Sequence, residues 1–500
     1  MLSLRAKTVA VIGAGPSGLA AAKYLRAEKA FDRITVFEQR SRVGGIWNYT
    51  PDAREDDLCN IPQTDPRGKN QDPVWKEAPS ATARSQDGVE NSAAFLSPMY
   101  EKLETNIPRG LMGFQDLEWP EDSQLFPKHE TVLDYIEEYG KDVQDLIQFE
   151  TQVINVEPLS ATFDSQWTVR TRPLHSTIFQ DEIFDAVIVA NGHFIVPFIP
   201  DIEGIKEWNE QYPGSITHSK YFRRPEEFSG KRVIVVGNSA SGLDISTQIA
   251  SFSQQPLLWS SKSTSQFGPA ADIRKRDLPP IARFLPSKNR AVEFEDGTIE
   301  KDIDAILFAT GYFYSLPFLH GIKPPLITEG SHVEHTYQHL FYAPQPTLSF
   351  LALPQRVIPF PIAEAQSAVL SRVYSGRLCL PSYKTLLSWY PSQLAALTSA
   401  CAPLKNFHLL PFPKDGNYIN ELSTWALTAT PREGLVHNGV GKKPPLWGEW
   451  EFWCRENFPA IRAAFGKLGE ARYKVRTLEE VGFRYEDHLK RQEREEAKIV

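Results

Sequence analysis

The sequence contains one arrangement twice: an apolar run ends in a glycine-rich loop and continues as a helical pattern. The first copy is VAVIGAGPSGLAAAKYL, residues 9–25, and the second is VIVVGNSASGLDIS, residues 233–246. A strand that passes through such a loop directly into a helix opens a dinucleotide-binding βαβ unit. We therefore expect an α/β protein with two Rossmann-like units that lie far apart in the sequence.

In the first unit, Gly13 permits the tight turn, Gly15 lets the backbone approach a pyrophosphate, and Gly18 lets the helix pack on its strand. The free N–H groups and the positive dipole end of the helix attract that anion. The next strand ends on Glu38, about twenty residues beyond the third glycine, where a carboxylate can accept hydrogen bonds from a ribose diol. The unit is predicted to bind a dinucleotide; the alternative is a purely structural glycine turn.

The second unit keeps Gly237 and Gly242, but Ser239 occupies the position of the middle glycine. Serine is small enough for a phosphate to approach, so the loop remains compatible with a dinucleotide. Two bound dinucleotides would explain why one chain carries two such units. FAD in the first and NADPH in the second would allow hydride transfer from nicotinamide to flavin.

The strand after the second loop favours NADPH over NADH. It ends in Ser260, Ser261 and Lys262, without an acid, and Arg223 and Arg224 lie just upstream of the unit. A carboxylate at this place would repel a 2′-phosphate, whereas hydroxyls and a cation can bind one. The alternative is that Lys262 is a solvated loop lysine.

Short β-type runs alternate with helical patterns along the chain, which predicts parallel sheets with helices on their faces. We expect both ends of the chain to form an FAD-binding domain, with a smaller NADPH-binding domain inserted into it. The expected ranges are 1–199 and 316–480 for the FAD-binding domain, 200–315 for the NADPH-binding domain and 481–500 for a charged tail. Residues 51–98, rich in Pro, Asp, Ser and Gly, are expected to be a long surface excursion.

The charge distribution excludes one class of partner. The formal net charge is −8 at pH 7 and no basic block occurs, so nucleic acid is not expected to bind. The most apolar uncharged run, residues 305–322, contains a glycine and a proline. It is predicted to form a buried strand and turn rather than a transmembrane helix.

The four cysteines, Cys59, Cys379, Cys401 and Cys454, are widely separated. This spacing predicts neither a disulfide framework nor a dithiol redox pair, and the sequence suggests no metal site. The first strand begins by Thr8, which leaves no room for the apolar segment of a signal peptide. We therefore expect a cytoplasmic protein.

Further stretches resemble the flavin-containing monooxygenases, class B enzymes in which one polypeptide uses FAD, NADPH and O2. They are EQRSRVGGIW at 38–47, YEKLETN at 100–106, YPGSITHSKYF at 212–222, DAILFATGY at 304–312 and IPFPIAEAQ at 358–366. They stand in the family's order. Two features depart from the family pattern: Tyr212 replaces the first phenylalanine of the fingerprint FxGxxxHxxx(Y/F), and the segment 51–98 is longer than in compact members.

The resemblance implies roles for individual residues. Asn106 would lie at the C4a position of the flavin as the catalytic residue, and Gln366 would lie near the isoalloxazine. His218 would belong to the cofactor site, as an interdomain hydrogen-bonding residue rather than a proton donor. The other implied cofactor-binding residues are Gly13, Gly15, Ser17, Gly18, Glu38, Gly45, Ile46 and Trp47 for FAD, and Gly237, Ser239, Ser241, Gly242 and Lys262 for NADPH. The simpler alternatives are that Asn106 caps a turn and that Trp47 only packs in the core.

The resemblance also implies a reaction. Reduced flavin would add O2 to give a C4a-hydroperoxide, whose distal oxygen is taken by a nucleophilic nitrogen or sulfur of a small organic substrate. Phe222 ends the fingerprint where Baeyer–Villiger enzymes carry tryptophan, which favours the heteroatom branch. The alternatives are Baeyer–Villiger oxygenation of a ketone, a flavoprotein dehydrogenase and a noncatalytic nucleotide-binding scaffold. The choice between nitrogen and sulfur is left open, as is a homodimer.

Overall fold

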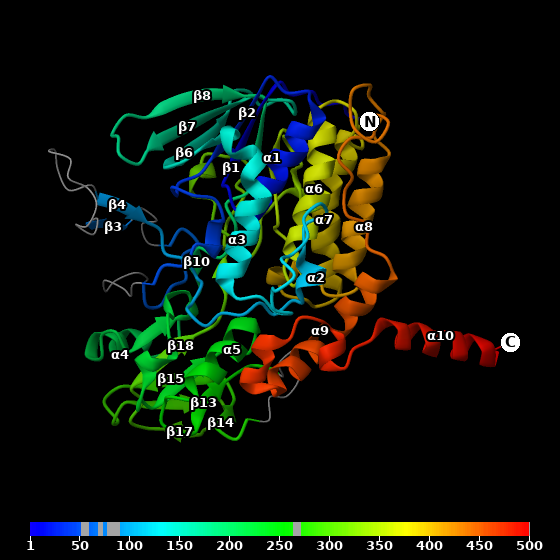
Figure 1. Ribbon diagram of the computed structural model, residues 1–500. Coiled ribbons are helices and arrows are strands. Elements are labelled where there is room, and N and C mark those ends of the chain that lie inside the picture. Colours follow the sequence, from blue (N-terminus) through cyan, green and yellow to red (C-terminus); the bar gives the residue numbers. More distant parts are fainter. Residues whose placement is uncertain (52–59, 69–73, 78–90, 264–271, 500) are drawn as a thin grey trace, which may run out of the picture.

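A computed structural model describes residues 1–51, 60–68, 74–77, 91–263 and 272–499. The described chain contains two mainly parallel sheets, and each glycine loop connects a central strand of one sheet to a helix (Figure 1). The predicted α/β class with two Rossmann-like units is thereby confirmed. The larger sheet and its helices lie above the smaller sheet in the view of Figure 1.

The larger sheet takes its strands from both halves of the chain. Its order is β20-β21-β22-β9-β1-β2-β5, and β1 pairs in parallel with β2 on one side and with β9 on the other. The chain leaves this sheet after β9 and returns to it at β20. The exact domain boundaries expected from the sequence remain predictions. The bounds are β1 Thr8–Ile12, β2 Arg33–Phe37, β5 Ile147–Gln148, β9 Ala186–Val189, β20 Thr336–Tyr337, β21 Phe341–Tyr342 and β22 Leu348–Phe350.

Alternate residues of β1 face two different layers. Val9 and Val11 pack with the helices α1 and α6, whereas Ala10 and Ile12 pack with the antiparallel sheet β6-β7-β8. This period of two, with both faces apolar, is typical of a strand buried on both sides. The bounds are α1 Pro16–Glu28, α6 Pro359–Tyr374, β6 Thr151–Pro158, β7 Trp167–Pro173 and β8 Gln180–Phe184.

The smaller sheet has the order β11-β18-β12-β13-β14, with every pair parallel. Helix α5 follows the second glycine loop, and the antiparallel strands β15, β16 and β17 form a separate sheet beside it. The bounds are α4 Ile205–Gln211, α5 Ala240–Ile249, β11 Ile216–His218, β12 Val233–Val236, β13 Leu257–Ser260, β14 Lys275–Leu278, β15 Ile281–Leu285, β16 Ala291–Phe294, β17 Ile299–Glu300 and β18 Ala305–Phe308.

The two segments that connect the larger sheet to the smaller sheet lie next to each other. β10 (Val196–Pro197) pairs antiparallel with β19 (Tyr312–Phe313), so the chain enters and leaves the smaller sheet at one place. The apolar run 305–322 forms β18, β19 and a short 3-10 helix at Pro317–Leu319, in agreement with the predicted strand and turn.

Of the remaining helices, α3, α7 and α8 lie beside the larger sheet, whereas α9 lies near α5 of the smaller sheet (Figure 1). Helix α10, within the predicted charged tail, projects away from the body (Figure 1). Within 51–98, β3 (Val74–Glu77) pairs with β4 (Asn91–Ala94), and much of this segment lies outside the described residues. Among the described helices, none has the length and apolar composition required to span a bilayer. The bounds are α2 Arg109–Met112, α3 His129–Gly140, α7 Tyr383–Ser399, α8 Lys414–Leu427, α9 Glu449–Lys467 and α10 Tyr485–Ile499.

Candidate active site

The two glycine loops have the same backbone geometry. Gly13 and Gly237 have φ angles of 104° and 111°, in the range that favours glycine. A Cβ atom on Gly13 would lie 2.7 Å from the carbonyl oxygen of Ala190. In the same way, a Cβ atom on Gly237 would lie 2.4 Å from the carbonyl oxygen of Ala309. Each loop therefore requires glycine at its first position, because it passes directly over the residue that follows the neighbouring strand.

The third glycine of each loop lies against the first. A Cβ atom on Gly18 would lie 1.8 Å from the carbonyl oxygen of Gly13, and one on Gly242 would lie 2.2 Å from that of Gly237. Both helices therefore begin in direct contact with the loop, and any larger residue would push the helix away. These two glycines are needed for packing and do not border the cavity described below.

The middle positions differ in side chain but not in backbone. Gly15 precedes α1 with φ −74° and ψ −177°, and Ser239 precedes α5 with φ −76° and ψ −173°. The side chain of Ser239 does not cap its helix. The first N–H groups of α5 therefore stay available to a ligand, and the positive dipole end favours an anion such as a pyrophosphate.

A second glycine segment lies against the first loop. Gly45 has φ 56°, and a Cβ atom there would lie 3.1 Å from the Cα atom of Gly15. Ile46 and Trp47 continue this segment as a short 3-10 helix, and both border the cavity. The side chain of Trp47 is thus at the cavity surface and is not buried in the core alone.

Glu38 follows β2, and its carboxylate is buried. One oxygen accepts a hydrogen bond from the N–H of Ala14 at 2.7 Å, and the other accepts one from the N–H of Arg40 at 2.8 Å. Burial raises the pKa of Glu38, and these backbone hydrogen bonds oppose the rise. Because the residue also borders the cavity, its remaining lone pairs can accept hydrogen bonds from a ribose diol.

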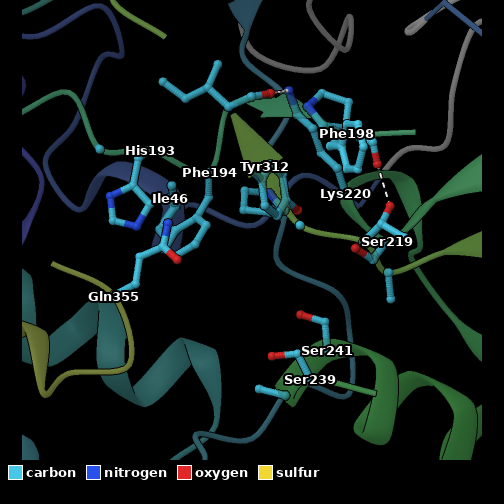
Figure 2. A pocket seen from close by; sticks show the side chains of 18 of the residues that line it. Ile46, His193, Phe194, Phe198, Ser219, Lys220, Ser239, Ser241, Tyr312 and Gln355 are labelled. Atoms are coloured by element: carbon cyan, nitrogen blue, oxygen red, sulfur yellow. Dashed lines mark hydrogen bonds between the residues drawn. The ribbon is translucent and has the colours of Figure 1, made fainter. Parts of the chain in front are cut away.

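One cavity of about 2430 Å³ joins the two loops. Sites for single small ligands occupy about 300–1,000 Å³, so this space has room for two dinucleotides. Figure 2 shows Ser239 and Ser241 at the start of α5 on one side, with Ile46 and His193 on another. The predicted site residues that border the cavity are Gly13, Gly15, Ser17, Glu38, Gly45, Ile46, Trp47, Asn106, Gly237, Ser239, Ser241 and Lys262.

Asn106 borders this cavity from a segment whose neighbours are fixed. The N–H of Thr105 donates to the carbonyl of Pro127 at 2.9 Å, and its hydroxyl donates to the carbonyl of Ile107 at 3.0 Å. Within the described part of the chain, no side-chain hydrogen bond is formed by Asn106. The amide therefore does not cap the turn and is available to a ligand.

Comparison with known proteins decides the family. Residues 83–268 and 282–396, more than half of the chain, match the family described as flavin-binding monooxygenase-like. The chain belongs to the flavin-containing monooxygenases. Residues 11–61 also match the NAD(P)-binding Rossmann-like domain, which shows a dinucleotide fold at the first loop without deciding which dinucleotide it binds.

The relatives of this monooxygenase cover nearly its whole length. It is 32% identical over 433 residues to flavin-containing monooxygenase FMO GS-OX3 of Arabidopsis thaliana, a match that covers 84% of each chain. It is 34% identical over 433 residues to FMO GS-OX-like 2 of the same plant, covering 83% of this chain and 84% of the relative. The structure of S-allyl-L-cysteine S-oxygenase from Allium sativum has 27% identity and a TM-score of 0.71, and the match covers 100% of both chains. The predicted family and monooxygenase activity are confirmed.

Gln366 does not reach the cavity of the monooxygenase. It is fully buried in α6, where its Oε1 accepts from the N–H of Ala352 at 2.8 Å and its Nε2 donates to the hydroxyl of Tyr418 at 3.0 Å. Ala352 itself borders the cavity. Gln366, which was expected near the isoalloxazine, thus lies one layer behind the cavity wall.

His218 is also buried and does not border the cavity. Its Nδ1 accepts from the N–H of Lys220 at 3.1 Å. Burial lowers the pKa of His218 to about 3, so the ring is neutral at physiological pH. This environment suits a hydrogen-bonding residue within the fold and not a proton donor.

Of the two arginines upstream of the second unit, Arg224 is exposed and Arg223 is not. Arg223 is buried, and its guanidinium donates to the carbonyls of Met99, Lys220 and Phe222 at 3.1, 3.1 and 3.0 Å. It does not border the cavity, whereas Lys262 does. A 2′-phosphate in the cavity is therefore expected to meet Lys262 and not Arg223.

Phe222, the last residue of the fingerprint, is buried as well. Its ring packs edge-on against Tyr100, with 5.2 Å between the ring centroids. Because Phe222 does not border the cavity, it can affect the substrate only through the residues packed around it.

Several residues that border the cavity were not identified from the sequence. His193 and Phe194 lie in the loop after β9 and border the cavity. The rule that ligands bind outside the carboxyl ends of parallel strands would have found them. Burial lowers the pKa of His193 to about 4. Gln355 and Tyr312 also border the cavity (Figure 2), and no local sequence pattern indicates them.

The thiols of Cys379, Cys401 and Cys454 are free, and Cys59 lies outside the described residues. Over the same described residues, no group of His, Cys, Asp and Glu side chains is arranged to hold a metal ion.

Proposed function

We propose that the monooxygenase binds FAD at the first loop and NADPH at the second, and that it oxygenates the sulfur of a small organic thioether. The observation that carries this proposal is that two loops of equal backbone geometry open onto one cavity. A shared cavity allows two dinucleotides to meet within one chain. The collisions that a Cβ atom would make at Gly13 and Gly237 fit the tight turn at the first glycine of a dinucleotide-binding loop.

The residues around the second loop suit NADPH. Ser239 and Ser241 face the cavity at the start of α5 (Figure 2). The side chain of Asn238 donates to the carbonyl of Ser263, which holds the turn containing Lys262 beside the loop. The hydroxyl of Ser260 donates to a backbone carbonyl and is buried, so Lys262 is the main candidate to bind the 2′-phosphate.

The chain itself provides positioning and neutral hydrogen bonding. When bound, the flavin supplies the redox chemistry with nicotinamide and dioxygen. The amide of Asn106 can donate a hydrogen bond without releasing a proton. The ring of His193 is also neutral at physiological pH, because burial lowers its pKa to about 4. Neutral groups at the cavity surface limit unproductive proton transfer to reactive oxygen species.

The preference for sulfur over nitrogen comes from one relative. S-allyl-L-cysteine S-oxygenase matches the whole chain at 27% identity. The experiment that tests the proposal offers the FAD-loaded protein a thioether, a tertiary amine and a cyclic ketone in turn, with NADPH or NADH, and identifies the products by mass spectrometry. We expect the S-oxide, formed with NADPH.

Each other outcome assigns a different function. An N-oxide alone would move the substrate class to amines, and an ester from the ketone would establish Baeyer–Villiger oxygenation. NADPH oxidation without any oxygenated product would favour a flavoprotein dehydrogenase. Nucleotide binding without NADPH oxidation would indicate a noncatalytic scaffold.

A further inference from the structure

The cavity wall contains an alanine in the left-handed backbone conformation. Ala352 has φ 55° and borders the cavity. This conformation is strained for a residue with a Cβ atom, so the surrounding structure must hold it. The preceding residue, Leu351, donates its N–H to the carbonyl of Val189 at 2.9 Å. The turn therefore lies at the carboxyl edge of the larger sheet, where ligands bind in α/β folds.

Gln366 holds this turn from behind. Its Oε1 accepts from the N–H of Ala352 at 2.8 Å, and its Nε2 donates to the hydroxyl of Tyr418 at 3.0 Å. That hydroxyl donates in turn to the carbonyl of Gln338 at 2.7 Å. These hydrogen bonds fix the orientation of the Gln366 amide. The N–H of Ala352 requires an acceptor, which is the amide oxygen. The hydroxyl of Tyr418 already donates its proton to Gln338, so it can only accept from the amide nitrogen.

The segment after the turn runs along the cavity before α6 begins. The N–H of Gln355 donates to the carbonyl of His408 at 2.8 Å, and its side-chain amide donates to the hydroxyl of Tyr314 at 3.1 Å. Figure 2 shows Gln355 beside His193. The segment is therefore anchored at Gln355 and at Ala352, and release of Ala352 would let the wall between these points move.

We propose that Gln366 is a positioning residue, which fixes the left-handed turn at Ala352 and with it the cavity wall at 352–355, without contacting the cofactors or the substrate. A buried amide is unfavourable in an apolar helix unless its hydrogen bonds are made, and here they are made to the wall and to its support. The proposal does not depend on the substrate class.

The first test is Gln366→Leu, which keeps the side-chain size and removes the hydrogen bond to Ala352. The matched control is Ser367→Ala, at the next buried position of α6, where the hydroxyl has no partner among the described residues. Hydrogen exchange of the peptide around 350–358 is measured by mass spectrometry. We expect exchange at least about fivefold faster in Gln366→Leu, as expected for loss of one hydrogen bond, and unchanged in Ser367→Ala.

The second measurement is peroxide released per NADPH oxidised, without substrate. We expect a severalfold increase in Gln366→Leu, because a displaced wall admits water and protons. Adding Ala352→Gly should return this ratio towards the wild-type value, because glycine adopts the left-handed conformation freely. Exchange and peroxide release equal to those of Ser367→Ala would overturn the proposal. So would a double variant that stays as uncoupled as the single one.

A further variant covers the case in which Gln366→Leu does not fold. In Gln366→Glu, a protonated carboxyl offers the same donor and acceptor as the amide, whereas the ionised form loses the donor to Tyr418. Peroxide release should be near the wild-type level at low pH and should rise with pH more steeply than in the wild type. Equal pH dependence in the two proteins would contradict a positioning role.

Discussion

At the scale of single residues, the lack of room for a Cβ atom determines which residues the two glycine loops can contain. Gly13 and Gly237 combine a positive φ with a neighbouring carbonyl that excludes a Cβ atom. Ser239 has the same backbone angles as Gly15, so the serine in the second loop changes its surface and not its shape. The first glycine of each loop thus leaves no room for a side chain, whereas the middle position tolerates a small one.

The substitution Gly237→Ala tests this difference. We expect the KM for NADPH to rise at least about tenfold, because the left-handed conformation alone costs about 1–2 kcal/mol and the methyl group adds a clash. The flavin content should stay unchanged. Gly230→Ala is the control, since Gly230 has φ 68° in the same domain and no atom within 4 Å of its Cβ position. Steady-state kinetics that show equal effects of both variants would argue against the loop assignment.

The substitution Lys262→Ala tests the 2′-phosphate site. A hydrogen bond to a charged group contributes about 1.5–3 kcal/mol, so kcat/KM for NADPH should fall by about tenfold or more. The value for NADH should change little, because NADH lacks this phosphate. The measurement is the ratio of kcat/KM for NADPH to kcat/KM for NADH, determined in one assay. An equal fall for both cofactors would remove Lys262 from the phosphate site.

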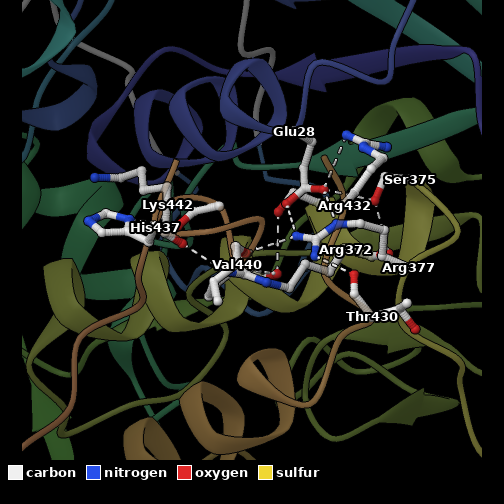
Figure 3. A network of polar contacts seen from close by, with 12 residues as sticks. Glu28, Arg372, Ser375, Arg377, Thr430, Arg432, His437, Val440 and Lys442 are labelled. Atoms are coloured by element: carbon white, nitrogen blue, oxygen red, sulfur yellow. Dashed lines mark hydrogen bonds and ion pairs between the residues drawn. The ribbon is translucent and has the colours of Figure 1, made fainter. Parts of the chain in front are cut away.

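At the scale of elements, a buried ion pair joins α1, the end of α6 and the segment 430–443 (Figure 3). Both carboxylate oxygens of Glu28 accept from Arg377, each at 2.7 Å, and one also accepts from Ser375 at 3.0 Å. Arg377 donates further to the carbonyl of Thr430 at 2.8 Å. The pair thus ties the helix after the first loop to the helix behind the cavity wall.

The substitution Arg377→Ala should destabilise the fold by about 3 kcal/mol, because it leaves the buried carboxylate of Glu28 with only the longer contact to Arg432 at 3.8 Å as an ion pair. Urea denaturation followed by circular dichroism measures this loss. The control is Asp145→Asn, which breaks the ion pair between Arg26 and Asp145, whose carboxylate is exposed. That change should stay within about 1 kcal/mol. A similar loss of unfolding free energy in both variants would contradict the conclusion that the buried ion pair stabilises the fold more than the exposed one.

Glu364, also in α6, should make the unfolding free energy depend on pH, because its pKa differs between the folded and unfolded states. Burial raises its pKa to about 7 from the ordinary value of 4.5, against the attraction of Lys442. Between these values the folded state binds more protons than the unfolded state, so stability falls as pH rises, by up to about 1.4 kcal/mol per pH unit. Glu364→Gln should lack this component between pH 5 and 7. Melting curves of both proteins across this range test it; parallel curves would contradict the assignment.

At the scale of the whole molecule, the sequence predicted the features that arise from neighbouring residues. The two loops, Glu38 and the alternation of strands and helices depend on local patterns of glycines, apolar residues and strand ends. The positions of Gln366 and Arg223 depend on contacts with segments far away in the sequence, such as Ala352 and Met99. No local pattern encodes these contacts. Motifs alone therefore do not show that Gln366 and Arg223 lie one layer behind the cavity surface.

The central claim is that one cavity couples NADPH oxidation to the transfer of oxygen from O2 to a thioether. The most direct measurement supplies the FAD-loaded protein with NADPH, a thioether and isotopically labelled O2, and counts labelled S-oxide against NADPH consumed. We expect about one labelled S-oxide for each NADPH, because the oxygen comes from O2 and the electrons from nicotinamide. Unlabelled S-oxide, or complete loss of NADPH to peroxide in the wild-type protein, would contradict it.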